Sequence, residues 1–101
     1  MKSRDRLSLT EKQKAEVKKR LEEKRAHKIE IILNEKSSHI KIHSWDDVRR
    51  IDRAIRRLDR GMYGRCIECR AYIEGERLKF MIEAERCASC HEHIESLERR
   101  H

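Results

Sequence analysis

The feature that most constrains this chain is the spacing of its four cysteines, C-x2-C-x17-C-x2-C. Cys66 and Cys69 form the first pair, and Cys87 and Cys90 form the second. A gap of two residues lets both sulfurs of a pair reach one ion around a tight turn, and Zn²⁺ accepts four thiolates in a tetrahedron. The spacing therefore predicts one Zn²⁺ bound by all four cysteines, in a closed shell with a structural role.

Other uses of these cysteines fit less well. The opening MKSRDRLSLTEK has no apolar segment of a signal peptide, and no apolar run approaches the ~20 residues that span a bilayer. We therefore expect a soluble, cytoplasmic protein without a membrane partner, in which paired cysteines bind metal rather than form disulfides. His91 and His93 follow Cys90 and are alternative ligands. Because four cysteines already fill the shell, we expect both histidines on the exposed face of a short C-terminal helix, with Ile94 and Leu97 inward.

The composition explains why a metal would be needed. Charged residues make up 45% of the 101 residues, and aromatic residues only 4%. So few apolar side chains build a thin core, and a structural Zn²⁺ site contributes of order 10 kcal/mol to the folding of small modules. We divide the chain into a flexible N-terminal arm at residues 1–9, a helical hairpin at 10–61, and a four-cysteine finger with a terminal helix at 62–101.

The first helix is expected from about Thr10 to Leu33. Thr10 and Gln13 form a capping-box pattern, and neither Gly nor Pro interrupts the run that follows. One alternative stays open: KIEIIL and HIKIH alternate with period two around NEKSS, so residues 28–43 also fit a small β-hairpin.

The second helix has a clear heptad-like seam. Ser44 and Asp47 fit a second capping box, and Gly61 fits a C-terminal stop. The seam residues are Val48, Ile51, Ile55, Leu58 and Met62. Such spacing is typical of a helix that lies along one partner, so we expect an antiparallel coiled coil in which the longer first helix extends beyond the second.

The stretch AIRRLDRGMYGRCIEC, then Arg77-Leu78, then CASC resembles the four-cysteine zinc finger of the DksA/TraR family. The match covers Ile51 to Cys90. The resemblance implies a mostly α fold: a coiled-coil hairpin, then a finger with two short strands and a C-terminal helix. It implies a bacterial transcription regulator that is not an enzyme and that binds RNA polymerase through the secondary channel, without sequence-specific DNA contact. We expect the chain to be a monomer. It also gives Tyr63 a packing role against the finger.

The chain departs from the family pattern at several positions. Arg70 stands where the family has Gly, which costs roughly 1 kcal/mol if that backbone is left-handed. Ile82 stands where the family has Pro, and Met81 and His91 stand at positions that bind the alarmone in some members, so alarmone binding is left open. In place of the family's acidic tip pair, the nearest candidates for tip or partner contacts are Trp45, Asp46 and Asp47.

A net charge of +7 keeps a second function open. A nucleic-acid-binding module would lay the arginines of the second helix against phosphates. Those arginines are Arg49, Arg53, Arg56 and Arg60, with Arg50 and Arg57 beside them. An interaction module with another target is a third reading. No nucleophile with its base, phosphate loop or open metal shell is visible, so we do not expect an enzyme.

Overall fold

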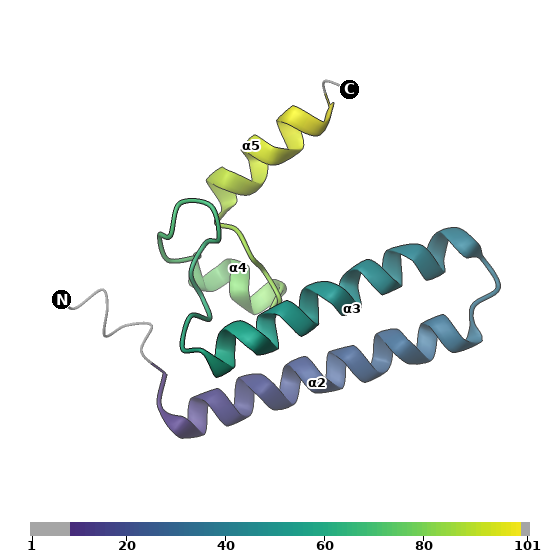
Figure 1. Ribbon diagram of the computed structural model, residues 1–101, viewed down its shortest axis with the longest axis horizontal. Helices are drawn as coiled ribbons and strands as arrows, with labels where there is room; N and C mark the ends of the chain where they lie inside the picture. Colours follow the sequence, from purple (N-terminus) through teal and green to yellow (C-terminus); the bar gives the residue numbers. More distant parts are fainter. Residues whose placement is uncertain (1–8, 100–101) are drawn as a thin grey trace.

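The computed structural model describes residues 9–99, which form a long helical hairpin with a smaller unit packed beside one end (Figure 1). The elements are α2 (Glu11–Asn34), α3 (Ser38–Asp59), α4 (Gly75–Phe80) and α5 (Ala88–Arg99). The arm predicted at residues 1–9 lies, except for its last residue, outside the described residues. Within residues 9–99, every helix is too short or too polar to span a membrane.

Helix α2 begins at the predicted capping box. The hydroxyl of Thr10 accepts a hydrogen bond from the Gln13 backbone N–H at 3.1 Å, and the Gln13 side chain accepts one from the Thr10 N–H at 2.9 Å. Two of the N–H groups that a helix start leaves unpaired are thereby satisfied.

The N-cap of α3 lies seven residues before the predicted cap at Ser44, so the second capping box, Ser44 with Asp47, is wrong. The cap is Ser37, whose hydroxyl accepts from the Ile40 N–H at 3.4 Å, and Ser44 is buried inside the helix. The carboxylate of Glu35 accepts from the N–H groups of Lys36 and Ser37, which closes the connection within residues 35–37. The alternative β-hairpin at residues 28–43 is therefore also wrong, because α2 continues to Asn34 and α3 already begins at Ser38.

The early start of α3 makes the two arms of the hairpin nearly equal. Helix α2 has 24 residues and α3 has 22, and they run antiparallel side by side (Figure 1). The predicted overhang of the first helix is thus wrong, since it followed from starting the second helix too late.

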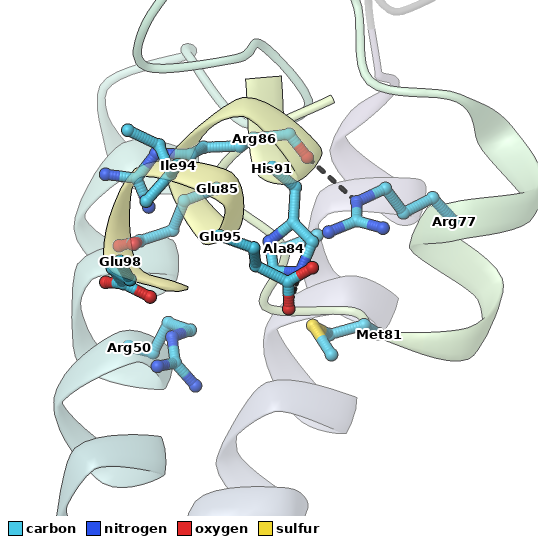
Figure 2. Close-up of a pocket in the computed structure, with 10 residues that line it drawn as sticks. All are labelled: Arg50, Arg77, Met81, Ala84, Glu85, Arg86, His91, Ile94, Glu95 and Glu98. Carbon is cyan, nitrogen blue, oxygen red and sulfur yellow. Dashed lines mark hydrogen bonds and ion pairs between the residues drawn. The ribbon is translucent and has the colours of Figure 1, made fainter. Parts of the chain in front are cut away.

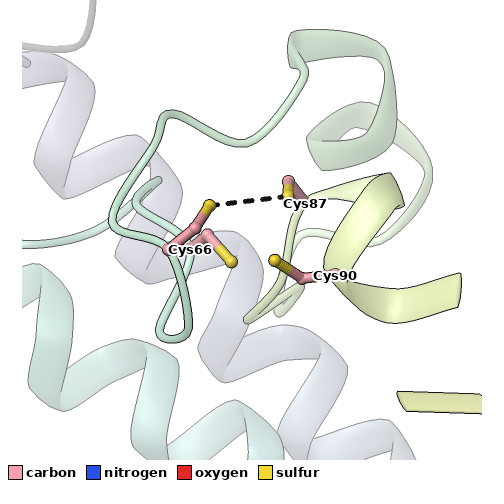
Figure 3. A group of neighbouring side chains, drawn as sticks. Cys66, Cys87 and Cys90 are labelled. Atoms are coloured by element: carbon pink, nitrogen blue, oxygen red, sulfur yellow. Dashed lines mark hydrogen bonds between the residues drawn. The ribbon is translucent and has the colours of Figure 1, made fainter. Parts of the chain in front are cut away.

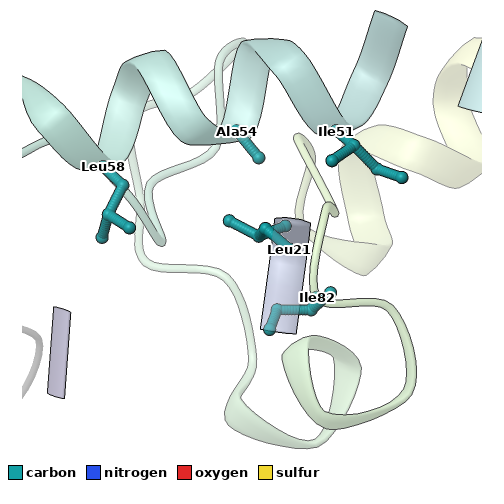
Figure 4. Close-up of a cluster of buried hydrophobic side chains, with 5 residues drawn as sticks. All are labelled: Leu21, Ile51, Ala54, Leu58 and Ile82. Atoms are coloured by element: carbon teal, nitrogen blue, oxygen red, sulfur yellow. The ribbon is translucent and has the colours of Figure 1, made fainter. Parts of the chain in front are cut away.

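The apolar core lies where the finger meets the hairpin. Its buried members are Leu21 from α2, Ile51, Ala54 and Leu58 from α3, and Ile82 from the segment before α5 (Figure 4). The predicted seam residues Val48, Ile51 and Leu58 are buried, Ile55 is half-buried, and Met62 is exposed beyond the end of α3. The heptad pattern thus identified the buried face of α3.

The small unit contains helices rather than the expected pair of strands. Within residues 9–99 the only pairing of β type is an isolated antiparallel bridge between Arg65 and Tyr72, and α4 occupies the region between the cysteine pairs. The predicted C-terminal helix is present as α5, although Leu97 is 42% exposed rather than packed inward.

Candidate metal centre

The first cysteine pair lies in a tight loop that follows α3. Gly61 and Gly64 have positive φ angles of 73° and 90°, and these turns lead the chain back toward the hairpin before Cys66. The Arg70 N–H donates to the Cys66 carbonyl at 3.0 Å, which closes the loop around the pair. Arg70 has φ of 67°, so the position at which the family has Gly is left-handed in this chain. The left-handed backbone on which the predicted cost of Arg70 depends is therefore present.

The second cysteine pair is placed by the start of α5. Cys87 precedes the helix, Cys90 lies in its first turn, and the His91 N–H donates to the Cys87 carbonyl at 2.9 Å. The carboxylate of Glu74, from the other side of the finger, accepts a hydrogen bond from the Ala88 N–H at 3.1 Å. The backbone N–H groups of Glu74 itself and of Ala88 lower the pKa of that carboxyl. A remote side chain thus caps α5 and fixes the direction in which Cys87 and Cys90 point.

The four sulfurs converge to one point. The Sγ atoms of Cys66, Cys69, Cys87 and Cys90 all lie within 4.8 Å of one another (Figure 3). Sulfurs at Zn–S distances of about 2.3 Å in a tetrahedron are about 3.8 Å apart, and the Sγ atoms of Cys69 and Cys87 are 3.8 Å apart. The donor set and the spacing therefore fit a tetrahedral metal ion with four thiolate ligands.

The thiols of this cluster influence one another's ionisation. Burial raises the pKa of the Cys66 thiol, but backbone N–H groups, led by those of Cys69 and Cys87, outweigh burial and lower the pKa to about 6. By contrast, contacts with the thiols of Cys87 and Cys66 raise the pKa of Cys90 to about 12. Four anionic sulfurs at such short range would repel each other, so all four could be thiolates only with a divalent cation bound between them.

Apolar side chains surround the cysteine cluster on its inner side. Ile73 and Ala84 are buried with Cys66 and Cys87, and Leu78 of α4 packs against them. Leu78 belongs to the Arg-Leu pair that carried the family resemblance, and Arg77 donates from its Nε to the Arg86 carbonyl at 2.9 Å. The Arg-Leu pair thus connects α4 to the segment that leads into the second cysteine pair.

Residues 82–85, between α4 and the second cysteine pair, dock the finger onto the hairpin. Ile82 enters the apolar core, and the hydroxyl of Tyr63 donates to the Ile82 carbonyl at 2.8 Å. Burial raises the pKa of Tyr63 to about 12, so its hydroxyl remains a donor even in alkaline solution near pH 10. The packing role assigned to Tyr63 is confirmed, and it includes this hydrogen bond.

Two buried carboxylates strengthen the docking. Glu83 accepts from Lys24 Nζ of α2 at 2.7 Å. Glu85 accepts from Arg53 of α3 and lies 3.5 Å from Arg57 Nη1. Burial alone would raise the pKa of Glu85, but the hydrogen bond and charge of Arg53 lower it overall. Sequence reasoning missed both carboxylates, and their only signal was an acidic run, EAE, opposite an arginine-rich helix.

The structure separates the predicted phosphate contacts. Arg53 pairs with Glu85, and Arg49 pairs with Asp46 at 2.6 Å. Arg56 is exposed on the same helix, and Arg60 is exposed at its C-cap. Part of the predicted basic stripe is therefore already neutralised by carboxylates within the chain.

Trp45, Asp46 and Asp47 lie inside α3 rather than in its first turn, because the helix begins at Ser38. Trp45 is 44% exposed, and Asp47 pairs with Lys28 of α2 at 3.0 Å. A tip or partner role for these three residues stays a prediction.

The alternative histidine ligands do not join the cysteines. Among residues 9–99, the potential metal ligands that gather around the cysteines are the four cysteines themselves, and neither histidine is among them. His91 Nε2 lies 3.1 Å from a carboxylate oxygen of Glu95, one turn along α5, and His93 is exposed. Both histidines lie on α5, as expected, but only His93 is exposed, because His91 is half-buried.

A charged pocket of about 230 Å³ lies between α3, α4 and α5 (Figure 2). Its charged lining combines three arginines, Arg50, Arg77 and Arg86, with three carboxylates, Glu85, Glu95 and Glu98. Met81 and His91 also line this pocket, and they stand at the two positions that the family resemblance associates with alarmone binding. The carboxylates offset the arginines, so this pocket is not selective for anions on charge alone.

Two solved structures share the fold. The RNA polymerase binding protein and transcriptional regulator Dks from Chlamydia trachomatis matches with a TM-score of 0.68 and 25% identity, over 87% of this chain and 93% of that chain. The transcription factor DksA2 from Pseudomonas aeruginosa matches with a TM-score of 0.53 and 24% identity, over 87% of this chain and 78% of that chain. No protein-family model matches the sequence, and no curated protein matches it significantly.

Proposed function

Because this chain has the fold and the four-cysteine cluster of a DksA-like protein, we propose that it is a bacterial transcription regulator that binds RNA polymerase. The observation that carries the proposal is the structural match to the Chlamydia protein, which spans nearly the full length of both chains. One matched protein is an RNA polymerase binding protein and transcriptional regulator, and the other is a transcription factor, so we infer a non-catalytic role for this chain. A polymerase partner would also place the protein in the cytoplasm.

The cysteine cluster would bind one structural Zn²⁺. Four thiolates leave no position for a water or a substrate, so the ion would fix the fold of the finger and take no part in a reaction. Its place at the foot of the hairpin supports a scaffolding role: the metal would hold the 82–85 segment against α2 and α3, where Ile82, Glu83 and Glu85 make their contacts.

The hairpin is the part that would enter the secondary channel of the polymerase. It is narrow, and its closed end lies far from the finger (Figure 1). The connection contains one acid, Glu35, and its carboxylate already accepts from two backbone N–H groups. We therefore do not propose that acidic residues at the end of the hairpin act in this chain as the family's tip pair is expected to do. Near the closed end, Trp45 and Ile42 offer exposed apolar surface instead, and contacts of that kind would hold the hairpin in the channel.

Binding to nucleic acid through α3 is the competing function. Its support is the exposed pair Arg56 and Arg60 together with the net charge of +7. The ion pairs of Arg49 and Arg53 weaken it, because a paired guanidinium releases fewer counterions from DNA.

Retention of core RNA polymerase on the immobilised, zinc-loaded protein tests the proposal. We expect retention, and we expect a protein known to occupy the secondary channel to displace the polymerase. Binding to plain duplex DNA should be weak at physiological salt. If the polymerase is not retained while DNA is bound with a steep salt dependence, of slope about −0.9 per phosphate contact, the nucleic-acid function replaces this one.

A pair of matched variants tests whether the hairpin makes the contact. Trp45 near the closed end and Leu97 on α5 are apolar and similarly exposed, at 44% and 42%. Trp45→Ala should weaken polymerase retention, whereas Leu97→Ala should leave it unchanged. The opposite pattern would place the contact on the finger side of the molecule.

A further inference from the structure

We propose that His39 and His43 form a second metal site, separate from the four-cysteine centre. The site would bind divalent transition-metal ions and exchange them readily. Both residues lie in the first two turns of α3, and both are exposed. Their rings are in edge contact, with centroids 4.4 Å apart and planes at 79°. The pair lies toward the closed end of the hairpin, which is far from the finger (Figure 1).

The spacing of the two histidines is what a chelating pair on a helix requires. Side chains four residues apart lie on the same face, one turn above the other. Two histidines at this spacing on one helix hold Zn²⁺ in metalloproteases. In this chain the intervening residues are Ile40, Lys41 and Ile42. The general base of those enzymes is therefore absent, and the site would bind an ion without performing hydrolysis.

The imidazoles are available to an ion. The one histidine in an ion pair within residues 9–99 is His91, on α5. Rotation about the side-chain bonds of His39 and His43 is open to solvent on the outer face, and the ring contact already places both rings in one patch. A single ion can therefore bridge them at the cost of two side-chain rotations, without movement of the backbone.

The ligand type and number select the class of ion. Imidazole suits Ni²⁺, Cu²⁺ and Zn²⁺, whereas Mg²⁺ and Ca²⁺ require several oxygen ligands. The nearest acids further along α3, Asp46 and Asp47, are held in ion pairs with Arg49 and Lys28. Water would fill the remaining positions, so the ion binds more weakly than at four thiolates and exchanges readily. The site therefore fills at higher free metal concentrations than the cysteine centre does.

A bound ion would change the end of the hairpin. It would join residues 39 and 43 across one helical turn, and it therefore opposes unwinding of α3 next to the connection at residues 35–37. Metal binding would stiffen the closed end of the hairpin and leave the finger as it is. This inference does not depend on the polymerase proposal.

The test is a calorimetric titration of Ni²⁺ into the full chain with its cysteine centre already loaded with Zn²⁺. We expect one saturable Ni²⁺ site per chain, weakened at least about tenfold by His39→Ala or by His43→Ala, because chelation by two ligands becomes contact by one. His27→Ala, an exposed histidine on α2, is the matched control and should bind as the wild type does. Binding should also fail below about pH 5, where protons compete for the imidazoles.

Two further readouts separate the proposed site from other sources of binding. Ni²⁺ should slow amide hydrogen exchange at residues 39–43 in the wild type and not in His39→Ala, and a zinc-sensitive dye should detect no released Zn²⁺. Absence of saturable binding, equal binding by both histidine variants and the wild type, or release of Zn²⁺ in step with Ni²⁺ uptake would each overturn the proposal.

Discussion

Leu21 is the side chain through which the hairpin and the finger share one core. It is 0% exposed and lies among Ile51, Ala54 and Leu58 of α3 and Ile82 of the finger (Figure 4). Leu21→Ala removes three carbons, worth about 0.8 kcal/mol each, and leaves a cavity that adds to the loss. We expect the free energy of unfolding to fall by about 3 kcal/mol. In a domain of this size, that lowers Tm by about 12–24 °C.

Thermal unfolding of the zinc-loaded protein, followed by circular dichroism, measures this loss. Leu33→Ala is the matched control on the same helix, since Leu33 is 79% exposed, and it should change stability by less than about 0.5 kcal/mol. The double variant with Ile82→Ala should lose less than the sum of the single losses, because the two side chains share one cavity. Equal losses for Leu21→Ala and Leu33→Ala, or strict additivity with Ile82→Ala, would refute the shared core.

Three further perturbations test the metal centre and the docking of the finger. Cys66→Ser should reduce bound zinc from one ion per chain to none and unfold α4 and α5, whereas the control Met62→Ser should do neither. Elemental analysis measures the bound zinc and circular dichroism measures the helix content, and zinc retained by Cys66→Ser would contradict the four-cysteine site. Arg70→Gly should raise the free energy of unfolding by about 1 kcal/mol by relieving the left-handed backbone, as denaturant unfolding would show, and a loss of stability would disprove the strain. Glu85→Ala should cost about 2 kcal/mol because Arg57, whose Nε has no hydrogen-bond partner among the described residues, loses its carboxylate. Arg57→Met in that background should recover part of the loss, and no recovery would mean that the pair does not act through buried charge.

Features that depend on short-range pattern were predictable from the sequence. The heptad spacing identified Val48, Ile51 and Leu58 as the buried face of α3, and the capping box placed the start of α2 at Thr10. The cysteine spacing identified all four members of the cluster. These predictions succeeded because helix periodicity, capping and chelation by C-x2-C are each set within a few residues of chain.

The start of α3 shows where local patterns compete. Ser37 and Ser44 both fit an N-cap, and the alternation of HIKIH also fits a strand. The antiparallel packing of α3 along α2 decides between them, because a helix from Ser38 extends contact with α2 over its whole length. No local signal contains that information.

The sequence by itself determined the buried face of α3, the start of α2 and the four metal-type ligands, since each follows from residues close together in the chain. Only the tertiary structure decided that Ile82, Glu83 and Glu85 fasten the finger to the hairpin. Lys24 and Glu83 are 59 residues apart in sequence. The four cysteines converge and thereby fold the segment between the two pairs back onto the hairpin. The path of that segment decides which carboxylate is buried against which cation, and neither the charge pattern nor the helix periodicity predicts that path.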